Sequence, residues 1–378
     1  MVKITDVARH ANVSASTVSY ALSGKRPISE ETRRRIEDSI RELGYRPHAG
    51  ARSLASSRSQ VIGLVLPLRK GMHMPVVMQF ATSVATAARE HDHDVLLLTH
   101  NEGEEGINRV ARSRLADAFI IMDVEMDDRR LPLLRGLDQP SVLIGFPSDP
   151  AGLTCIDLDF AGAGEACVEH LASLGHGTVA LVGSPPEVYV RGTGFARRVA
   201  AGFTAAADRL GLRSSVHPCP ETPAAAQAMA EQLLHEQPEL SGVVIHNEPV
   251  TQPLIAAFQT MGLRVPQDLS VVAICPDETA EQAPLPISSV SIPSAEIGTG
   301  AVDLLMAKLA EHDGVPETTT LPATLTERAT SAAVSSATAP TSGGSAGAHP
   351  HAGLAWADTS LAQRVSDTAS TRLPLSDP

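Results

Sequence analysis

The sequence predicts an all-helical head followed by an α/β domain made of two doubly wound parallel-sheet subdomains. Three observations support this prediction. Short helical patterns fill residues 1–46, short apolar runs alternate with helical stretches from residue 60, and that alternation occurs twice. A chain of 378 residues that is 43% hydrophobic can bury two or three cores of this kind.

Residues 2–24 predict two short helices separated by a turn. We expect Thr5 to cap the first helix and Asn12 to end it. Ser14 is expected to cap the second helix, and Gly24 to end it. This arrangement is a helix-turn-helix. The apolar positions recur at helical spacing and are Val7, Ala8 and Ala11 in the first helix and Val18, Ala21 and Leu22 in the second.

The exposed face of the second helix carries the small residues Ala15, Ser16 and Ser19, which allow a helix to enter the major groove of DNA. A helical hairpin without a partner has the same pattern, so the motif alone leaves both interpretations open. A third helix follows, with Ser29 as its cap and Gly44 at its end. Its apolar face consists of Ile36, Ile40 and Leu43.

The segment after the third helix, residues 47–56, has a weak helical pattern. It is too short, and too weakened by Gly50, to form a stable helix alone. We therefore expect it to fold only against a partner.

The first 54 residues contain the motifs Ile4-Thr5-Asp6-Val7-Ala8, Val13-Ser14, Thr17-Val18-Ser19, Gly44-Tyr45-Arg46-Pro47 and Ala51-Arg52-Ser53-Leu54. Together these motifs resemble the LacI/GalR family of bacterial transcription regulators. The resemblance implies that the head binds double-stranded DNA as part of a homodimer, since a two-fold protein matches a palindromic operator.

The resemblance also implies a role for each contact residue. The implied base-reading residues are Ala15, Ser16 and Tyr20. The implied contacts to the DNA backbone are Thr5, Ser14, Thr17, Ser19, Lys25 and Arg26. In the hinge, Ala51 and Leu54 are implied to enter the minor groove, where an apolar wedge unstacks one base step. Many relatives have Arg in place of Tyr20, and a phenol cannot make the forked contact to guanine, so the operator sequence does not transfer.

The charge of the chain is divided between its two parts. Residues 1–60 carry 11 basic and 6 acidic side chains, a net charge of +5, whereas the rest of the chain carries −18. A basic head beside an acidic body is typical of a protein that binds DNA through one end. The candidate phosphate contacts are Lys3, Arg9, Lys25, Arg26, Arg33 and Arg34, each of which could equally be a solvated surface charge.

The sequence contains no catalytic or metal-binding motif in the structural context that such a motif requires. Gly343-Gly344-Ser345-Ala346-Gly347 matches a hydrolase pattern but lies in a Ser/Ala/Gly-rich run, and His91-Asp92-His93-Asp94 fits a polar loop. There is no P-loop and no dinucleotide-binding glycine motif. The four cysteines lie far apart and form no C-x-x-C pair. We expect no enzyme activity, no cofactor and no metal.

The chain has no run of about eighteen apolar residues and no apolar signal-peptide stretch at its N-terminus. We therefore expect a cytoplasmic protein. The tail is rich in Ala, Ser, Thr and Pro and is expected to be largely disordered. Leu354, Leu361 and Val365 make barely one heptad repeat, which argues against a tetramerising coiled coil.

From residue 60 the apolar runs predict buried parallel strands. The predicted strands are 61–66, 94–98, 118–122 and 141–144, then 179–182, 242–245 and 269–274. The predicted helices are 77–90, 162–174, 194–210, 224–236 and 253–261. The LacI/GalR family has a periplasmic-binding-protein-like effector domain of this design, and local matches continue to about residue 330. In such domains the chain crosses between the lobes three times, here near 159–162, 289–293 and 321–324.

These boundaries define the expected domains. The head is 1–46, the hinge and linker are 47–59, the effector-binding and dimerisation domain is 60–328, and the tail is 329–378. Lobe one covers about 60–160 and 292–321, and lobe two covers about 161–290 and 322–328.

Asn247 directly follows a predicted strand and matches the effector-contacting Asn of the family. An amide donates and accepts, so it suits a hydroxyl-rich ligand such as a sugar. The alternative is a turn residue that caps the next helix. Asp277 matches the family's acidic pair less well, because Cys275 and Pro276 intervene after the strand. The family's effector-binding Arg is replaced here by Val199, which leaves Arg198 and Arg191 as substitutes.

The sequence therefore predicts a ligand-responsive repressor that a sugar effector releases from a palindromic operator. A corepressor-dependent or ligand-independent regulator and an enzyme fused to a DNA-binding head are the alternatives.

Overall fold

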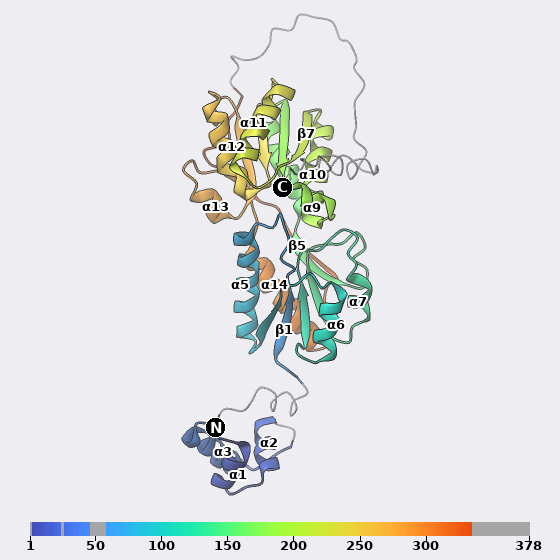
Figure 1. The fold of residues 1–378 in the computed structure, drawn as a ribbon, viewed down its shortest axis with the longest axis vertical. Helices are drawn as coiled ribbons and strands as arrows, with labels where there is room; N and C mark the ends of the chain where they lie inside the picture. The colour runs from blue at the N-terminus through green and yellow to red at the C-terminus, as the bar shows by residue number, and fades with distance from the viewer. Residues whose placement is uncertain (1, 24–25, 46–57, 335–378) are drawn as a thin grey trace, which may run out of the picture.

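The computed structural model describes residues 2–23, 26–45 and 58–334 (Figure 1). Several sequence-based expectations lie outside these ranges. They concern Gly24 and Lys25, the hinge residues Ala51 and Leu54, and the tail from residue 335 onward. The expectation that the disordered tail begins at residue 329 is wrong for residues 329–334, because Thr330 is fully buried and its carbonyl accepts the Val271 N–H of lobe two at 2.8 Å.

Three helices form the head, as the periodicity predicts (Figure 1). They are α1 (Ile4–His10), α2 (Ala15–Ser23) and α3 (Glu30–Leu43). Their buried core is Val7, Ala8, Ala11, Val18, Ile36 and Tyr45. Leu22 was expected in this core but is 39% exposed, because the inward face of α2 is centred on Val18.

The helix caps of the head follow the sequence with one exception. Ser14 Oγ accepts a hydrogen bond from the Thr17 N–H at 3.1 Å, and Ser29 Oγ accepts from the Thr32 N–H at 3.3 Å. The prediction that Thr5 caps α1 is wrong. Helix α1 begins at Ile4, and the carboxylate of Asp6 reaches back to accept the Lys3 N–H at 2.9 Å.

Lobe one is built on a parallel sheet with the strand order β11-β5-β4-β3-β1-β2. Its strands are β1 (Val61–Val65), β2 (Asp94–Leu98), β3 (Ala118–Ile121), β4 (Ser141–Ile144), β5 (Thr154–Leu158) and β11 (Thr318–Leu321). Its helices are α5 (Met74–Glu90), α6 (Glu104–Arg112), α7 (Leu131–Gly136) and α14 (Ser294–Leu309).

Lobe two has the same design, with the strand order β12-β10-β9-β8-β6-β7 and an antiparallel β12. Its strands are β6 (Thr178–Gly183), β7 (Arg213–Pro218), β8 (Gly242–Ile245), β9 (Ser270–Cys275), β10 (Ser288–Ser291) and β12 (Leu325–Thr326). Its helices are α8 (Phe160–Ser173), α9 (Pro186–Val190), α10 (Gly194–Leu210), α11 (Pro223–Glu236), α12 (Glu248–Thr260) and α13 (Asp277–Glu281). The predicted fold class is confirmed.

The apolar pattern of the sequence does not predict the strands β7, β11 and β12, for a physical reason. Strand β7 reads RSSVHP and β11 reads TTTL, and both lie at or near a sheet edge where polar side chains face water. Neither contains the apolar run that marks a buried parallel strand. Strand β12 is only two residues long.

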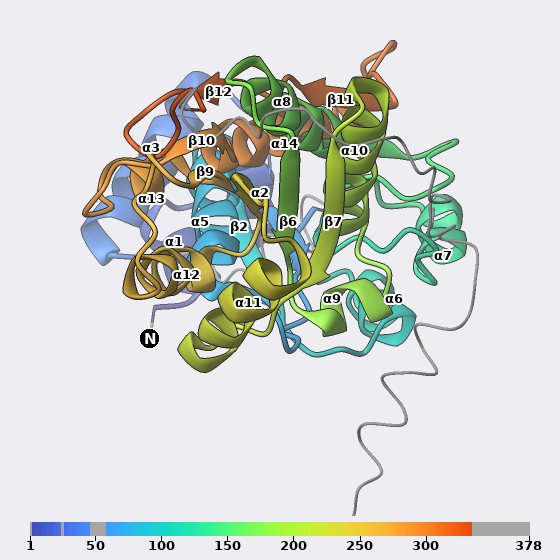
Figure 2. The same cartoon turned by 90° about the horizontal axis from the view of Figure 1, so that it is seen from above.

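Each sheet is covered by helices on both faces, so alternate residues of a strand enter different cores. In β6, Val179 and Leu181 pack toward α8 and α10, whereas Ala180 and Val182 pack toward α11 and α12. Figure 2 shows these two helix layers on either side of the sheet.

The chain passes between the lobes three times. It leaves β5 for α8 at Asp159, leaves β10 for α14 at residues 292–293, and leaves β11 for β12 at residues 322–324. These passages coincide with the three stretches expected from the sequence. Because of the second passage, α14 packs against α5 in lobe one although it follows a strand of lobe two (Figure 1).

Helices α8 and α10 approach so closely that two contact positions accept only glycine. A Cβ atom at Gly202 would overlap the backbone of Ala161, and a Cβ atom at Gly164 would overlap the backbone of Val199. This packing fixes α8 and α10 relative to each other. Phe160 and Phe195, at the N-terminal ends of these helices, line the interlobe cavity described below.

We expect Gly202→Ala to destabilise lobe two by roughly 1–3 kcal/mol, because the added methyl must push the two helices apart. The urea-unfolding midpoint measures this loss. Gly136→Ala in α7 is the matched control, since a Cβ atom there meets nothing within 4 Å. Equal midpoints for the two variants would show that the α8–α10 contact tolerates a side chain.

Candidate functional site

A cavity of about 130 Å³ lies between the two lobes. It is formed where the carboxyl ends of the strands of each sheet face one another, which is the usual ligand position in open α/β sheets. Its apolar lining includes Phe80, Phe160, Phe195 and Ile292. Its polar lining consists of His73, Asp123, Asp157, Ser184, Arg191, Glu221, His246, Asn247 and Glu248.

Asn247 lines this cavity and is only 3% exposed. Its Nδ2 donates to the carbonyl oxygens of Gly183 at 3.0 Å and Cys219 at 2.7 Å. Its Oδ1 accepts no hydrogen bond from the described part of the chain. The residue occupies the N-cap position of α12, but its side chain makes no capping bond, which argues against the alternative of a simple helix cap.

An aromatic cluster forms one wall of the cavity. The rings of Phe160, Phe195 and His246 lie with centroids 5.6–5.8 Å apart. Burial lowers the pKa of His246 to about 4, so its imidazole is neutral at pH 7. Its Nδ1 has no hydrogen-bond partner within the described residues. This wall combines apolar ring faces with a neutral polar atom.

Four carboxyl groups line the cavity, and the sequence analysis identified none of them. Burial raises the pKa of Asp157 to about 7, and burial followed by the charge of Glu221 raises the pKa of Glu248 to about 7. Burial also raises the pKa of Asp123 and of Glu221. Asp157 lies one residue before the end of the unpredicted strand β5, and Glu221 follows the unpredicted strand β7. Of the four, only Glu248 could have been found from the sequence, because it is adjacent to the candidate Asn247.

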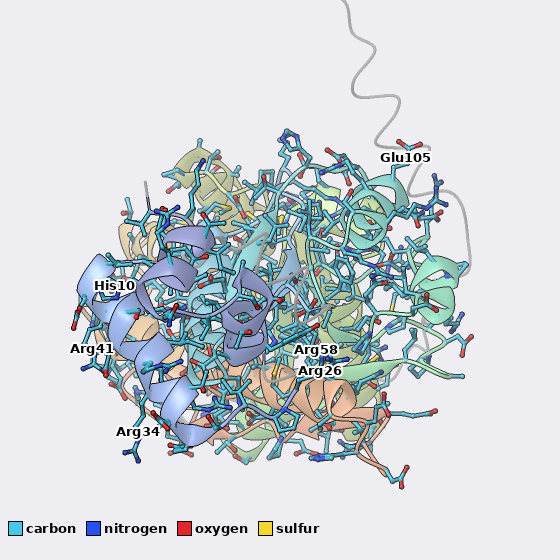
Figure 3. The ribbon with its side chains drawn as sticks, turned by 90° about the horizontal axis from the view of Figure 1, so that it is seen from below. His10, Arg26, Arg34, Arg41, Arg58 and Glu105 are labelled. Atoms are coloured by element: carbon cyan, nitrogen blue, oxygen red, sulfur yellow. The ribbon has the colours of Figure 1, made fainter. Side chains whose placement is uncertain are left out.

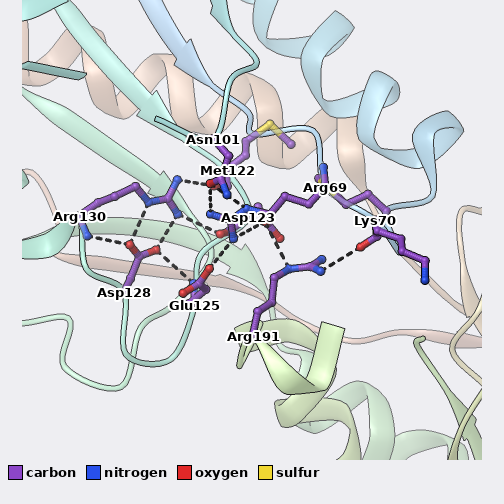
Figure 4. A network of polar contacts seen from close by, with 10 residues as sticks. Arg69, Lys70, Asn101, Met122, Asp123, Glu125, Asp128, Arg130 and Arg191 are labelled. Atoms are coloured by element: carbon purple, nitrogen blue, oxygen red, sulfur yellow. Dashed lines mark hydrogen bonds and ion pairs between the residues drawn. The ribbon is translucent and has the colours of Figure 1, made fainter. Parts of the chain in front are cut away.

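Arg191 connects the two lobes at the edge of the cavity (Figure 4). It reaches from α9 of lobe two to lobe one, where its Nε lies 3.7 Å from Asp123 Oδ2 and its Nη1 donates to the Lys70 carbonyl at 3.0 Å. Arg69 lies 3.1 Å from the same Asp123 oxygen.

The loop that carries Asp123 is held from the other side by a buried ion pair (Figure 4). Arg130 contacts Asp128 at 2.6 Å and donates to the backbone carbonyls of Met122 at 3.1 Å and Asp123 at 2.9 Å. These contacts fix the position of the Asp123 carboxylate toward Arg191.

Arg198 and Asp277 lie outside the cavity, so we do not retain them as effector-contacting residues. Arg198 donates to the carbonyls of Phe146 at 3.0 Å and Pro147 at 3.1 Å, and thus joins the lobes away from the cavity. Asp277 pairs with Arg328 at 3.0 Å. Strand β9 runs to Cys275 and Pro276 precedes α13, so the carboxylate is placed beside Arg328 instead of the cavity.

In the head, the N-terminus of α2 carries a cluster of hydroxyl groups. Ser14 Oγ lies 2.7 Å from Ser16 Oγ and 2.8 Å from Thr17 Oγ1, and Ser14 and Ser16 are exposed. Ala15 packs partly against the head core and is less available than expected. Thr5 is exposed and Ser19 is half-buried.

Basic side chains lie near this face and along α3. The guanidinium of Arg26 lies 5.3 Å from the centroid of the half-buried Tyr20 ring, which places a candidate phosphate contact beside a candidate base reader. Figure 3 shows Arg34 and Arg41 projecting outward from α3. Both are exposed and pair with acids of the same helix, Arg34 with Glu30 at 3.8 Å and Arg41 with Asp38 at 3.3 Å.

The described ranges contain no group of three or more His, Cys, Asp or Glu side chains arranged to hold a metal ion. All four cysteines are buried and unpaired. None of the helices in residues 2–23, 26–45 and 58–334 is long and apolar enough to cross a membrane.

Comparison with known proteins agrees with this architecture. Residues 3–48 match the family described as bacterial regulatory proteins, lacI family, and residues 168–331 match a periplasmic binding protein-like domain. The chain is 27% identical to the HTH-type transcriptional regulator AglR of Rhizobium meliloti over 84% of this chain and 90% of AglR. It is 26% identical to catabolite control protein A of Staphylococcus xylosus over 82% of this chain and 94% of that protein.

Solved structures show the same fold. The lac repressor dimer bound to operator and the anti-inducer ONPF has a TM-score of 0.74 at 23% identity, over 88% of this chain and 99% of the repressor chain. The CelR–cellobiose complex has a TM-score of 0.62 at 22% identity, over 87% of this chain and all of the CelR chain. The chain combines a LacI-type helix-turn-helix head with a periplasmic-binding-like domain. It belongs to the LacI/GalR family of DNA-binding transcription regulators.

We expect Asp157→Asn to stabilise the protein at pH 8 but not at pH 4. The folded pKa of Asp157 is about 7, above the ordinary value near 3.8, so the unfolded chain ionises first as the pH rises. Stability is therefore lost between about pH 4 and pH 7, by up to roughly 4 kcal/mol. Urea-unfolding midpoints at the two pH values measure the difference.

The exposed Asp127→Asn serves as the control for this change of charge. A stability difference between Asp157→Asn and the wild type that stays constant with pH would contradict the raised pKa.

Proposed function

We propose that this protein is a repressor that binds a palindromic operator as a dimer and is released by a sugar effector bound between its lobes. The observation that carries the proposal is the buried Asn247, a residue of the interlobe cavity lining whose Oδ1 has no hydrogen-bond partner among the described residues, in a chain whose head carries the LacI-family motif. A buried acceptor of this kind is costly unless a ligand or water satisfies it.

The head supplies the proposed DNA contacts. Ser16 is exposed at the N-terminus of α2, where the hydroxyl groups of Ser14 and Thr17 and the free N–H groups of the helix suit a phosphate or a base edge. Ala15, Ser16 and Tyr20 are the proposed base readers. Thr5, Ser14, Thr17, Ser19, Lys25 and Arg26 are the proposed backbone contacts, with Ala51 and Leu54 in the minor groove.

The lobes supply the proposed response to ligand. A sugar ring lying on Phe160 and Phe195 would place hydroxyl groups against Asn247, and would change how the lobes sit at the three chain crossings. The altered lobes would then change the cost of ordering the hinge on DNA. A coupling of ~1–3 kcal/mol would change operator affinity roughly 5- to 150-fold.

We assign this protein no catalytic activity, because the relatives that it matches are transcription regulators. Its work on operator DNA would place it in the cytoplasm.

We expect Tyr20→Ala to weaken binding to a selected operator by about tenfold or more while changing binding to random duplex little, since base contacts are worth ~1–3 kcal/mol and phosphate contacts are independent of sequence. Operator sequences are first enriched from a random pool, and affinities are then measured by fluorescence anisotropy at fixed salt. Equal losses on both duplexes would remove Tyr20 from base reading, and failure to enrich any sequence would contradict operator binding itself.

We expect Asn247→Ala to weaken sugar-dependent release of the operator by about tenfold or more, because a buried hydrogen bond to the ligand is lost. Mono- and disaccharides are screened by thermal shift with the wild type, and the binders are titrated into the protein–operator complex. Asn108→Ala, on α6 and outside the cavity lining, is the matched control. The variant Asn247→Ala also loses the two bonds to Gly183 and Cys219, so circular dichroism is used to check that it remains folded. An unchanged response would exclude Asn247 from the effector site.

A further inference from the structure

The polar atoms that face the cavity are mostly hydrogen-bond acceptors. The amide orientation of Asn247 is fixed because its Nδ2 already donates to two carbonyls, so only Oδ1 remains for a ligand. Asp157 presents a carboxyl group whose Oδ1 accepts the Leu158 N–H at 3.0 Å. Ser184 uses its hydroxyl to donate to the His246 carbonyl at 3.4 Å. A ligand that fits this lining must supply donors to Asn247 Oδ1 and to the ionised form of the carboxyl groups.

Two carboxyl groups of lobe two line the same cavity, and neither has an ion-pair partner among the described residues. Glu221 follows β7 and Glu248 begins α12, and the charge of Glu221 contributes to the raised pKa of Glu248. Neither side chain makes an ion pair or a hydrogen bond to another side chain in the part of the chain that the structure describes. A positive group between them would relieve this repulsion.

The cavity lining contains one permanently charged cationic side chain in the described part of the chain, and it already has partners in the protein. Arg191 is the one Arg or Lys among the described lining residues. Its Nη1 donates to the Lys70 carbonyl, and its Nε lies 3.7 Å from Asp123 Oδ2, an ion-pair distance without a hydrogen bond. Burial lowers the pKa of His73 as well as that of His246, so both imidazoles are neutral at pH 7. Lys70 is exposed and pairs with Glu187 at 2.5 Å. An anionic ligand would therefore face four carboxyl groups and one guanidinium, whose charge is opposed by the Asp123 carboxyl group.

We infer that the cavity selects a polyhydroxylated ring that carries an amine, such as an amino sugar, and disfavours sugar acids and sugar phosphates. The inference rests on the proposed sugar response and names the charge class of that effector. The amine lies between Glu221 and Glu248, the hydroxyl groups donate to Asn247 Oδ1 and Asp157, and the apolar face of the ring lies on Phe160 and Phe195. Desolvated ammonium groups also gain from nearby aromatic faces.

The test uses ligands that share one ring and differ in charge. Glucosamine, glucose, glucuronate and glucose 6-phosphate form one set, and the corresponding galactose compounds form the second. Dissociation constants are measured by titration calorimetry with the full chain at pH 7. We expect the amine of the better-binding set to bind at least about tenfold tighter than the neutral sugar, and the two anions to bind weakest.

Glu221→Gln/Glu248→Gln is expected to reduce the preference for the amine about tenfold or more while still binding the neutral sugar. Glu231→Gln on the exposed face of α11 is the matched control, with a glutamate removed away from the cavity. If the double variant does not fold, the preference for the amine is measured with the single variant Glu248→Gln and compared with the wild-type ranking of the ligands.

The outcomes are distinguishable. A neutral or anionic member that binds tightest overturns the charge assignment and leaves the sugar response standing. A double variant that keeps the full preference for the amine overturns the assignment of the two glutamates. No binding by any member, together with no hit in the saccharide screen, contradicts the sugar response itself and the inference with it.

Discussion

The amide of Asn247 is the interaction on which the effector site depends. Its nitrogen bridges the ends of two strands by donating to Gly183, at the end of β6, and to Cys219, just after β7. Asn247 itself follows β8, so one side chain ties three strand ends together. Because both donor hydrogens are used in the protein, the oxygen is oriented as an acceptor. Structural support thus uses the nitrogen of this amide and leaves its oxygen for the proposed ligand.

A second constraint comes from the contacts between the lobes. The backbones of the two lobes bond directly, from Met126 to Gly192 at 2.8 Å and from Gly194 to Val124 at 2.9 Å. Arg191 and Arg198 add polar contacts across the same boundary. Apart from those of Arg198, these contacts lie beside the cavity, so a ligand that displaces or reinforces them would change how the lobes are held. That change is the physical route that we propose from effector to DNA.

The electrostatics of the cavity follow from its enclosure. Carboxyl groups that lose water hold their protons more tightly, which is why Asp157 and Glu248 reach pKa values of about 7. The same loss of water keeps His246 neutral. The cavity is therefore a weakly screened, acceptor-rich space in which the charge of a ligand matters more than it would at the surface.

The sequence by itself determined the features that depend on neighbours in the chain. The caps at Ser14 and Ser29 and the left-handed stop at Gly44 involve bonds across three or four residues, and the buried strands show as apolar runs. Asn247 was identifiable because it directly follows such a run. Thr5 was misassigned because Asp6 competes for the same helix start, a choice that two local patterns leave open.

Tertiary structure alone decided which distant side chains share the cavity. It separated Arg191, at the cavity, from Arg198 and Asp277, which have partners elsewhere. It also added Asp157, which lies within β5, and Glu221, which follows β7; neither strand has a long apolar run of its own. Local periodicity reports which face of an element is buried, but the position of one strand end opposite another depends on packing between segments that are far apart in the chain.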